Sequence, residues 1–151
     1  MTLYFAYGWN MDRGAMQGRC PGARPLGVAM ASGWRFFVTT DGYASIARAG
    51  GDEVFGVLWE VGPRDVAALN TYESLDSGLY ARKRIAVRLG YVKKAALVYI
   101  ARATAEGRPR PRYMEMIVEA AQDWELPDDY VKTLRRWLPP GSRGAAESEV
   151  A

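Results

Sequence analysis

The order of the hydrophobic patterns along the chain constrains its fold more than any other feature. Strand-like segments precede Gly107, and two amphipathic helical segments follow it. Regular alternation of strands and helices would predict a doubly wound parallel sheet, whereas strands first and helices last favour the α+β class. We therefore expect an α+β fold.

Apolar periodicity and turn residues place the individual elements. Strands are expected at 3–7, 28–30, 35–40, 44–48, 54–61, 80–89 and 92–101, with turns at Asp41-Gly42 and Gly50–Asp52 and a bulge or tight bend at Gly56. Helices are expected at 10–17, from Pro63 to about Glu73, from Tyr113 to Trp124, and from Pro127 onward. Residues 1–141 are expected to form one domain, and the small, polar residues 142–151 a flexible tail.

Composition and charge narrow the class of protein. The chain has 151 residues, 49% of them hydrophobic, which is typical of a globular protein with a proper core. It has neither an apolar run long enough to cross a bilayer nor the pattern of a signal peptide, so no membrane association and a cytoplasmic location are expected. The net charge of +3 is modest and the arginines are dispersed, so we expect a small acidic substrate rather than nucleic acid as the partner.

Missing residue types limit the chemistry further. The chain has no histidine and a single cysteine, Cys20. This excludes Ser-His-Asp and Cys-His catalysis, histidine metal sites, multi-cysteine metal sites and an intramolecular disulfide. Cys20 is interpreted as a small buried hydrophobe. Acid–base chemistry must then come from a carboxylate, a lysine or a tyrosine.

Residues Tyr4 to Met11 form the first candidate site. An apolar strand runs into Gly8 and then into Asn10, which is typical of a strand–loop–helix junction. Unpaired N–H groups at such a junction favour a carboxylate or a phosphate. The alternative is that Asn10 only caps a short helix.

Glu73 is the second candidate. Val66 and Leu69 define the inward stripe of the helix that begins at Pro63, and Glu73 is the next residue on that stripe. Burial and the negative end of the helix dipole would both raise the pKa of its carboxyl toward the range useful to a base. The alternative is an ordinary surface glutamate at a helix end.

Three blocks of sequence carry a resemblance to the γ-glutamylcyclotransferase family, which is related to the AIG2-like proteins. The segment Tyr4–Met11 is similar to the family's Tyr-Phe-Ala-Tyr-Gly-Ser-Asn opening. The segments Val54–Trp59, Leu69–Glu73 and Gly78–Tyr80 resemble its glycine-containing strand, its Leu-Asp-x-x-Glu helix end and its Gly-x-Tyr return. The stretch Pro111–Tyr130 is similar to the closing segment of the glutathione-pathway type.

The resemblance implies a fold, a reaction and a set of residues. The implied fold is a small mixed-sheet barrel with flanking helices. The implied reaction releases the γ-glutamyl group of a small substrate as 5-oxoproline, without metal or cofactor. Glu73 matches the family's catalytic glutamate, and the loop that holds the α-carboxylate matches Tyr7, Gly8, Trp9 and Asn10. Tyr80 and Tyr113 match tyrosines of the family's pattern and are further candidates for substrate binding.

Departures from the family pattern leave two hypotheses open. Trp9 stands where the family has serine, Asn70 where it has aspartate, and Ser74-Leu75 where it has Gly-Val, while Asp76 adds a negative charge close to Glu73 in the sequence. An indole is far bulkier than a hydroxymethyl group. The chain is therefore either a cyclotransferase that acts on a small γ-glutamyl amine or amino acid, or a catalytically silent binding module whose pocket Trp9 has altered. A homodimer is compatible with either hypothesis.

Overall fold

The computed structural model describes residues 1–73 and 77–140. Their strands are β1 (Thr2–Ala6), β2 (Arg24–Val38), β3 (Ala44–Val61), β4 (Tyr80–Leu89) and β5 (Val92–Ala101). Their helices are the 3-10 helix η1 (Trp9–Met11), α1 (Arg13–Arg19), α2 (Pro63–Tyr72), α3 (Tyr113–Asp123) and α4 (Asp128–Arg135). The expected tail at 142–151 lies outside the described residues, as do Ser74, Leu75 and Asp76.

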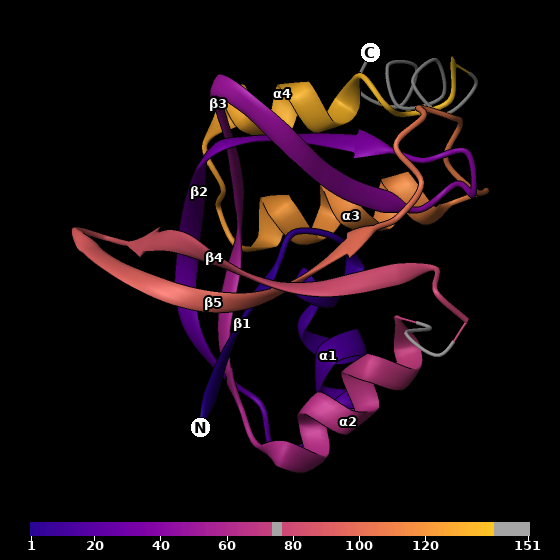
Figure 1. Cartoon of the computed structure of the whole chain (residues 1–151). Coiled ribbons are helices and arrows are strands. Elements are labelled where there is room, and N and C mark those ends of the chain that lie inside the picture. Colours follow the sequence, from indigo (N-terminus) through magenta and orange to yellow (C-terminus); the bar gives the residue numbers. More distant parts are fainter. Residues whose placement is uncertain (74–76, 141–151) are drawn as a thin grey trace.

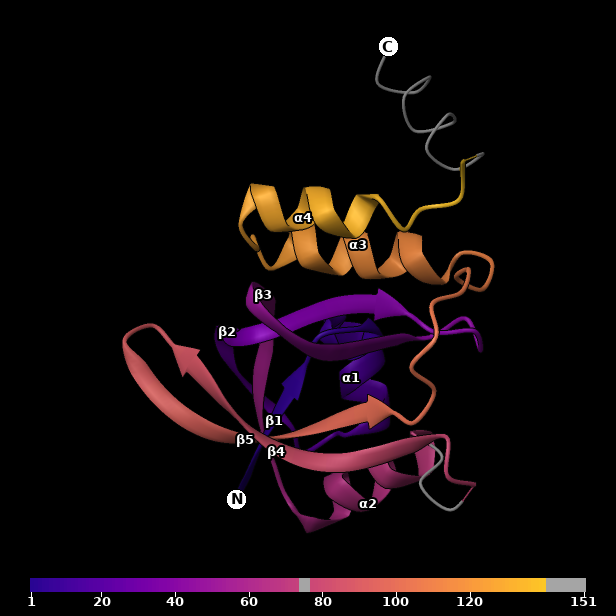
Figure 2. The same cartoon turned by 45° about the horizontal axis from the view of Figure 1, so that its top comes forward.

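The strands close into a barrel in the order β1-β3-β2-β4-β5. All neighbours are antiparallel except β1 and β5, which meet in parallel at Tyr4 and Leu97. The helices α3 and α4 lie side by side against the hairpin of β2 and β3, and α2 lies on the opposite side of the molecule (Figures 1 and 2). The expected α+β class and mixed-sheet barrel are confirmed.

One hydrophobic core runs through the barrel and continues beneath the helices. Phe5 and Leu58 fill it from the strands, and Ile117 and Leu134 extend it from α3 and α4. Cys20 is fully buried in the same core, and burial raises the pKa of its thiol to about 11. The interpretation of Cys20 as a small hydrophobe is therefore confirmed.

The expected turn at Gly50–Asp52 is wrong, because β3 runs straight through it. Ser32 pairs with Glu53 and Trp34 with Arg48, so residues 49–52 lie opposite Gly33 alone. Gly33 and Gly51 take φ angles of +83° and +87°, which glycine adopts readily. The glycines therefore form a large bulge within one long hairpin rather than a chain reversal. The expected gap between the strands at 28–30 and 35–40 contains Gly33 and is part of the same bulge.

Gly56 does not form the expected bulge or bend. It pairs in regular register with Ala29, but a Cβ atom at this position would lie 2.3 Å from the carbonyl oxygen of Ala6. Glycine is needed because the backbone of β1 passes so close. This contact lies at Ala6, the last residue of β1, just before the loop that follows.

We predict that Gly56→Ala destabilises the protein by about 1–3 kcal/mol or more, because the added methyl group overlaps the β1 backbone. The matched control is Gly18→Ala in α1, where a Cβ would have no atom within 4 Å. That substitution should stabilise the protein by about 0.5–1 kcal/mol through helix propensity. Urea unfolding of both variants tests the prediction, and equal effects would contradict the role given to Gly56.

Candidate functional site

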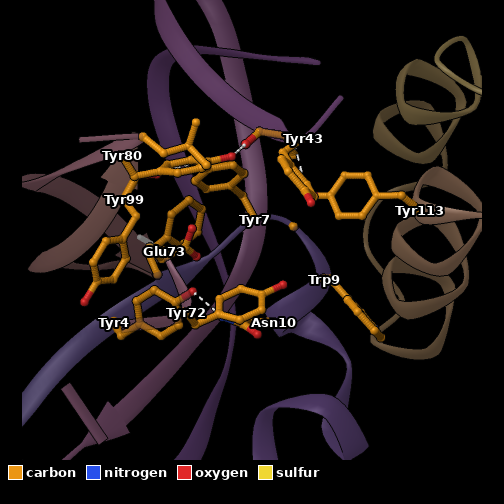
Figure 3. A pocket seen from close by; sticks show the side chains of 14 residues that line it. Tyr4, Tyr7, Trp9, Asn10, Tyr43, Tyr72, Glu73, Tyr80, Tyr99 and Tyr113 are labelled. Atoms are coloured by element: carbon orange, nitrogen blue, oxygen red, sulfur yellow. Dashed lines mark hydrogen bonds between the residues drawn. The ribbon is translucent and has the colours of Figure 1, made fainter. Parts of the chain in front are cut away.

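A cavity of about 140 Å³ opens where the ends of β1, β5 and α2 and the starts of β3, β4 and α3 converge (Figure 3). Ligand pockets for drug-sized molecules are larger, at about 300–1,000 Å³, so this cavity suits a group of amino-acid size. Its wall consists of Tyr4, Phe5, Tyr7, Gly8, Trp9, Asn10, Tyr43, Ala44, Tyr72, Glu73, Leu79, Tyr80, Tyr99 and Tyr113.

Tyrosines form most of the polar wall, which contains seven of the nine in the chain. Three of their hydroxyl groups donate hydrogen bonds to specific partners. The Oη atoms of Tyr7 and Tyr80 donate to the carbonyl oxygens of Tyr99 and Ala44 at 2.5 and 2.6 Å, and the Oη atom of Tyr99 donates to Oδ1 of Asn70 at 2.7 Å. The cavity is therefore shaped before any ligand binds.

Tyr113 reaches the same wall from the first residue of α3. Its Oη accepts a hydrogen bond from the backbone N–H of Ala44 at 3.1 Å (Figure 3). Burial raises the pKa of its hydroxyl above the ordinary value, so Tyr113 stays a neutral phenol at physiological pH. It can therefore act as a hydrogen-bond donor toward the cavity.

Among the described residues, Glu73 is the one carboxylate in the lining, and α2 places it there. It directly follows the last residue of α2, and its backbone N–H donates to the carbonyl oxygen of Leu69 at 2.8 Å. Burial raises the pKa of its carboxyl from 4.5 to about 7, although Arg19 partly offsets that rise. No group in the described part of the chain donates a hydrogen bond to the carboxylate. The alternative of an ordinary surface glutamate is wrong.

The loop after β1 supplies the unpaired N–H groups that the sequence predicted. The backbone N–H groups of Gly8, Trp9 and Asn10 have no acceptor among the described residues, and all three residues line the cavity. Such groups are suited to an anion. The loop therefore presents donors to the same space that Glu73 borders.

The expected helix at 10–17 is divided, and Asn10 does not cap it. Residues Trp9–Met11 form η1, and Asp12 caps α1 by accepting a hydrogen bond from the N–H of Ala15 at 2.8 Å. The Asn10 side chain is buried instead, and its Nδ2 donates to Oη of Tyr4 at 3.0 Å while its Oδ1 accepts from Arg19. Asn10 fixes the loop from within.

Trp9 lies at the edge of the cavity. Its ring is directed away from Glu73 (Figure 3), and it packs against the hydrophobic core. The indole therefore does not occupy the space between Glu73 and the loop. The substitution of a large side chain for serine changes the rim of the cavity more than its interior.

All seven residues chosen from the sequence line this one cavity: Tyr7, Gly8, Trp9, Asn10, Glu73, Tyr80 and Tyr113. Sequence reasoning missed Tyr43, Tyr72 and Tyr99 as lining residues, and gave Tyr4 no separate role. Tyr72 directly precedes Glu73, so its position was a usable signal. Tyr43 and Tyr99 reach the site only through the barrel topology, which no local pattern reveals.

The described residues contain no group of three or more histidine, cysteine, aspartate or glutamate side chains able to hold a metal ion. Among them there is also no helix that is long and apolar enough to cross a membrane.

Comparisons with known proteins place this geometry in context. Residues 53–134, more than half of the chain, match the family model of the AIG2-like family. A γ-glutamylcyclotransferase of Bos taurus is 28% identical over 98% of this chain and 85% of its own length. The Homo sapiens protein of the same name is 26% identical with the same coverage. A solved structure of a γ-glutamyl cyclotransferase matches with a TM-score of 0.85 and 26% identity, over 91% of this chain and 88% of that one.

We predict that Glu73→Gln stabilises the fold in a pH-dependent way. The folded carboxyl has a pKa of about 7, whereas the unfolded chain titrates at about 4.3. Between these values the folded state holds a proton that the unfolded state releases, so wild-type stability falls as the pH rises through this window. The variant should be more stable than wild type at pH 8 by up to about 3 kcal/mol, with little difference at pH 4.

Urea unfolding at pH 4, 6 and 8 tests this prediction, with the exposed Glu119→Gln in α3 as the matched control. A stability difference between wild type and Glu73→Gln that does not change with pH would show that the carboxyl is not desolvated.

Proposed function

The chain belongs to the AIG2-like family, and on that premise we propose that it is an enzyme of the γ-glutamylcyclotransferase type. The proposed substrate is a small γ-glutamyl amine or γ-glutamyl amino acid, and the products are 5-oxoproline and the free amine. Support comes from the two relatives of that name, which match 98% of this chain, and from the solved cyclotransferase structure.

The observation that carries the proposal is the desolvated Glu73 carboxylate, which borders the same small cavity as the unpaired N–H groups of Gly8, Trp9 and Asn10. A general base is most effective when its pKa lies near the working pH. A pKa of about 7 lets one carboxyl accept a proton in one step and return it in the next. Neither histidine nor a nucleophilic cysteine is required.

Each part of the γ-glutamyl group has a counterpart in the cavity. Its α-carboxylate is an anion that suits the unpaired N–H groups of the loop. Its chain must fold back so that the α-amine reaches the γ-carbonyl carbon, and the tyrosine wall is fixed in a shape that can hold it there. Holding reacting groups in place removes up to about 7–11 kcal/mol of the barrier in ideal intramolecular reactions.

The proposed reaction is an internal transfer of the acyl group. The neutral α-amine attacks the γ-carbonyl carbon, and Glu73 takes one proton from the attacking nitrogen. The new C–N bond closes a five-membered ring, the old bond to the leaving nitrogen breaks, and protonated Glu73 gives its proton to that nitrogen. Glu73 ends in its starting protonation state, so the proton taken from the attacking nitrogen is the one given to the leaving nitrogen.

The alternative function is a binding module without turnover, and it depends on Trp9 altering the interior of the cavity. The indole lies at the rim and points away from Glu73 (Figure 3), so this observation favours the enzyme. In either case the proposed ligand is a small γ-glutamyl compound, and the proposed setting is the γ-glutamyl and glutathione metabolism of the cytoplasm.

We predict that purified protein releases 5-oxoproline from at least one member of a panel of γ-glutamyl amines and γ-glutamyl amino acids. Glu73→Gln should lower kcat about 10²–10⁴-fold, the usual contribution of a positioned base. The wild-type kcat/KM should fall as the pH drops below about 7, because protonated Glu73 cannot accept the amine proton. Glu119→Gln should behave like the wild type in the same assay.

Absence of turnover with the whole panel would reject the enzyme, and full turnover by Glu73→Gln would reject the assigned base.

We further predict that Trp9→Ser changes the KM values of substrates that differ in their leaving group. The kcat should stay within a few-fold of wild type, because the indole lies outside the space between Glu73 and the loop. Steady-state kinetics on the same panel measures this. Turnover that appears only in Trp9→Ser, with ligand binding but no reaction in the wild type, would establish the alternative function.

A further inference from the structure

Arg19 is a charged residue beside the cavity that neither the sequence nor the proposed reaction assigns. It is the last residue of α1, and its guanidinium group reaches two further segments. Its Nη1 donates to Oδ1 of Asn10, and its Cζ lies 3.5 Å from the centre of the Tyr72 ring. Arg19 therefore connects α1, the loop after β1 and the end of α2.

No ion pair within residues 1–73 and 77–140 explains this position. The described residues place no carboxylate within 4.0 Å of the Arg19 guanidinium, which is only partly exposed. A cation at the end of a helix gains some energy from the helix dipole. The helix dipole does not require the specific contacts to Asn10 and Tyr72. Because both of these residues line the cavity, we look for the role of the contacts in the site.

The hydrogen bonds continue from Arg19 through Asn10 to Tyr4. The Asn10 amide is oriented by its two partners, since its Oδ1 faces Arg19 and its Nδ2 donates to Oη of Tyr4. Tyr4 is only 4% exposed and lines the cavity, and no described residue accepts its hydroxyl proton. The Tyr4 hydroxyl is thus a buried hydrogen-bond donor that can donate to a ligand in the cavity (Figure 3).

We propose that Arg19 is a positioning residue of the site: its guanidinium group orients Asn10, and Asn10 in turn holds the loop donors and the Tyr4 hydroxyl toward the bound substrate. Only the kinetic consequences of this inference rest on the proposed function. The hydrogen-bonded chain from Arg19 to Tyr4 is a property of the folded protein with or without turnover.

Arg19 has a second effect through its charge. Its cation lowers the pKa of Glu73 and so opposes the rise that burial causes. The two effects are separable, because lysine keeps the charge but lacks the planar fork that bonds and stacks at the same time. Arg19→Lys therefore tests the orientation of Asn10, and Arg19→Met tests orientation and charge together.

The chain offers a matched control on the same helix. Arg13 also stacks on an aromatic ring, with its Cζ 3.5 Å from the centre of the Trp124 ring, but Arg13 is exposed and Trp124 does not line the cavity. Arg13→Met removes an equivalent stacked cation from α1. Any general effect of losing such a cation should appear in both methionine variants.

The experiment combines kinetics on the active γ-glutamyl compound with NMR of the Asn10 side-chain amide and of the Glu73 carboxyl carbon. Arg19→Met should lower kcat/KM about 10- to 100-fold, as expected for loss of a hydrogen bond to a charged group. It should also shift the Asn10 amide signals and move the Glu73 titration to higher pH. Arg19→Lys should shift the Asn10 signals and lower kcat/KM but keep the Glu73 titration near wild type.

Arg13→Met should change none of these quantities. The proposal is overturned if Arg19→Met and Arg13→Met give the same Asn10 signals, the same Glu73 titration and the same kcat/KM. If the wild type turns over no compound, the proposed function fails, while the two NMR readouts still decide whether Arg19 orients Asn10. If Arg19→Met does not fold, Arg19→Lys and Tyr4→Phe decide, with the fully exposed Tyr91→Phe as the control.

Discussion

The site depends on one physical constraint, which is that the Glu73 carboxylate is removed from water. Burial raises the pKa of this group to about 7, and the described protein gives the carboxylate no hydrogen-bond donor to relieve the cost. The fold therefore has to hold Glu73 in place by other means. It does so through α2, whose residue Leu69 is fully buried in the core and whose first turn is fixed by the Asp65 carboxylate, which accepts from the N–H of Gly62 at 3.1 Å.

The barrel brings the remaining parts of the site to Glu73. Gly56 allows the backbone of β1 to approach β3 closely at Ala6, and the loop that follows β1 lines the cavity. The parallel contact between β1 and β5 closes the barrel near Tyr99, and the Oη atom of Tyr7 donates to the Tyr99 carbonyl oxygen across that seam. The site is therefore assembled by long-range strand pairing rather than by one motif.

The sequence correctly predicted those elements whose structure depends mainly on residues that are close together in the chain. The hairpin of β4 and β5 and the start of α2 at Pro63 follow from alternation and from proline, and both were placed correctly. The glycines at 50 and 51 misled the prediction because a bulge and a turn use the same backbone conformations. The roles of Asn10 and Arg19 were not predictable, since each depends on contacts between segments that only the folded barrel brings together.

We propose that the loop of Gly8, Trp9 and Asn10 binds the α-carboxylate while Glu73 faces the α-amine. The most direct test is a crystal structure of Glu73→Gln with a γ-glutamyl compound bound, because that variant should bind without turnover. We expect the α-carboxylate to accept hydrogen bonds from the loop N–H groups and the α-amine to lie within hydrogen-bond distance of residue 73. A compound bound with its α-carboxylate away from the loop, or outside this cavity, would contradict it.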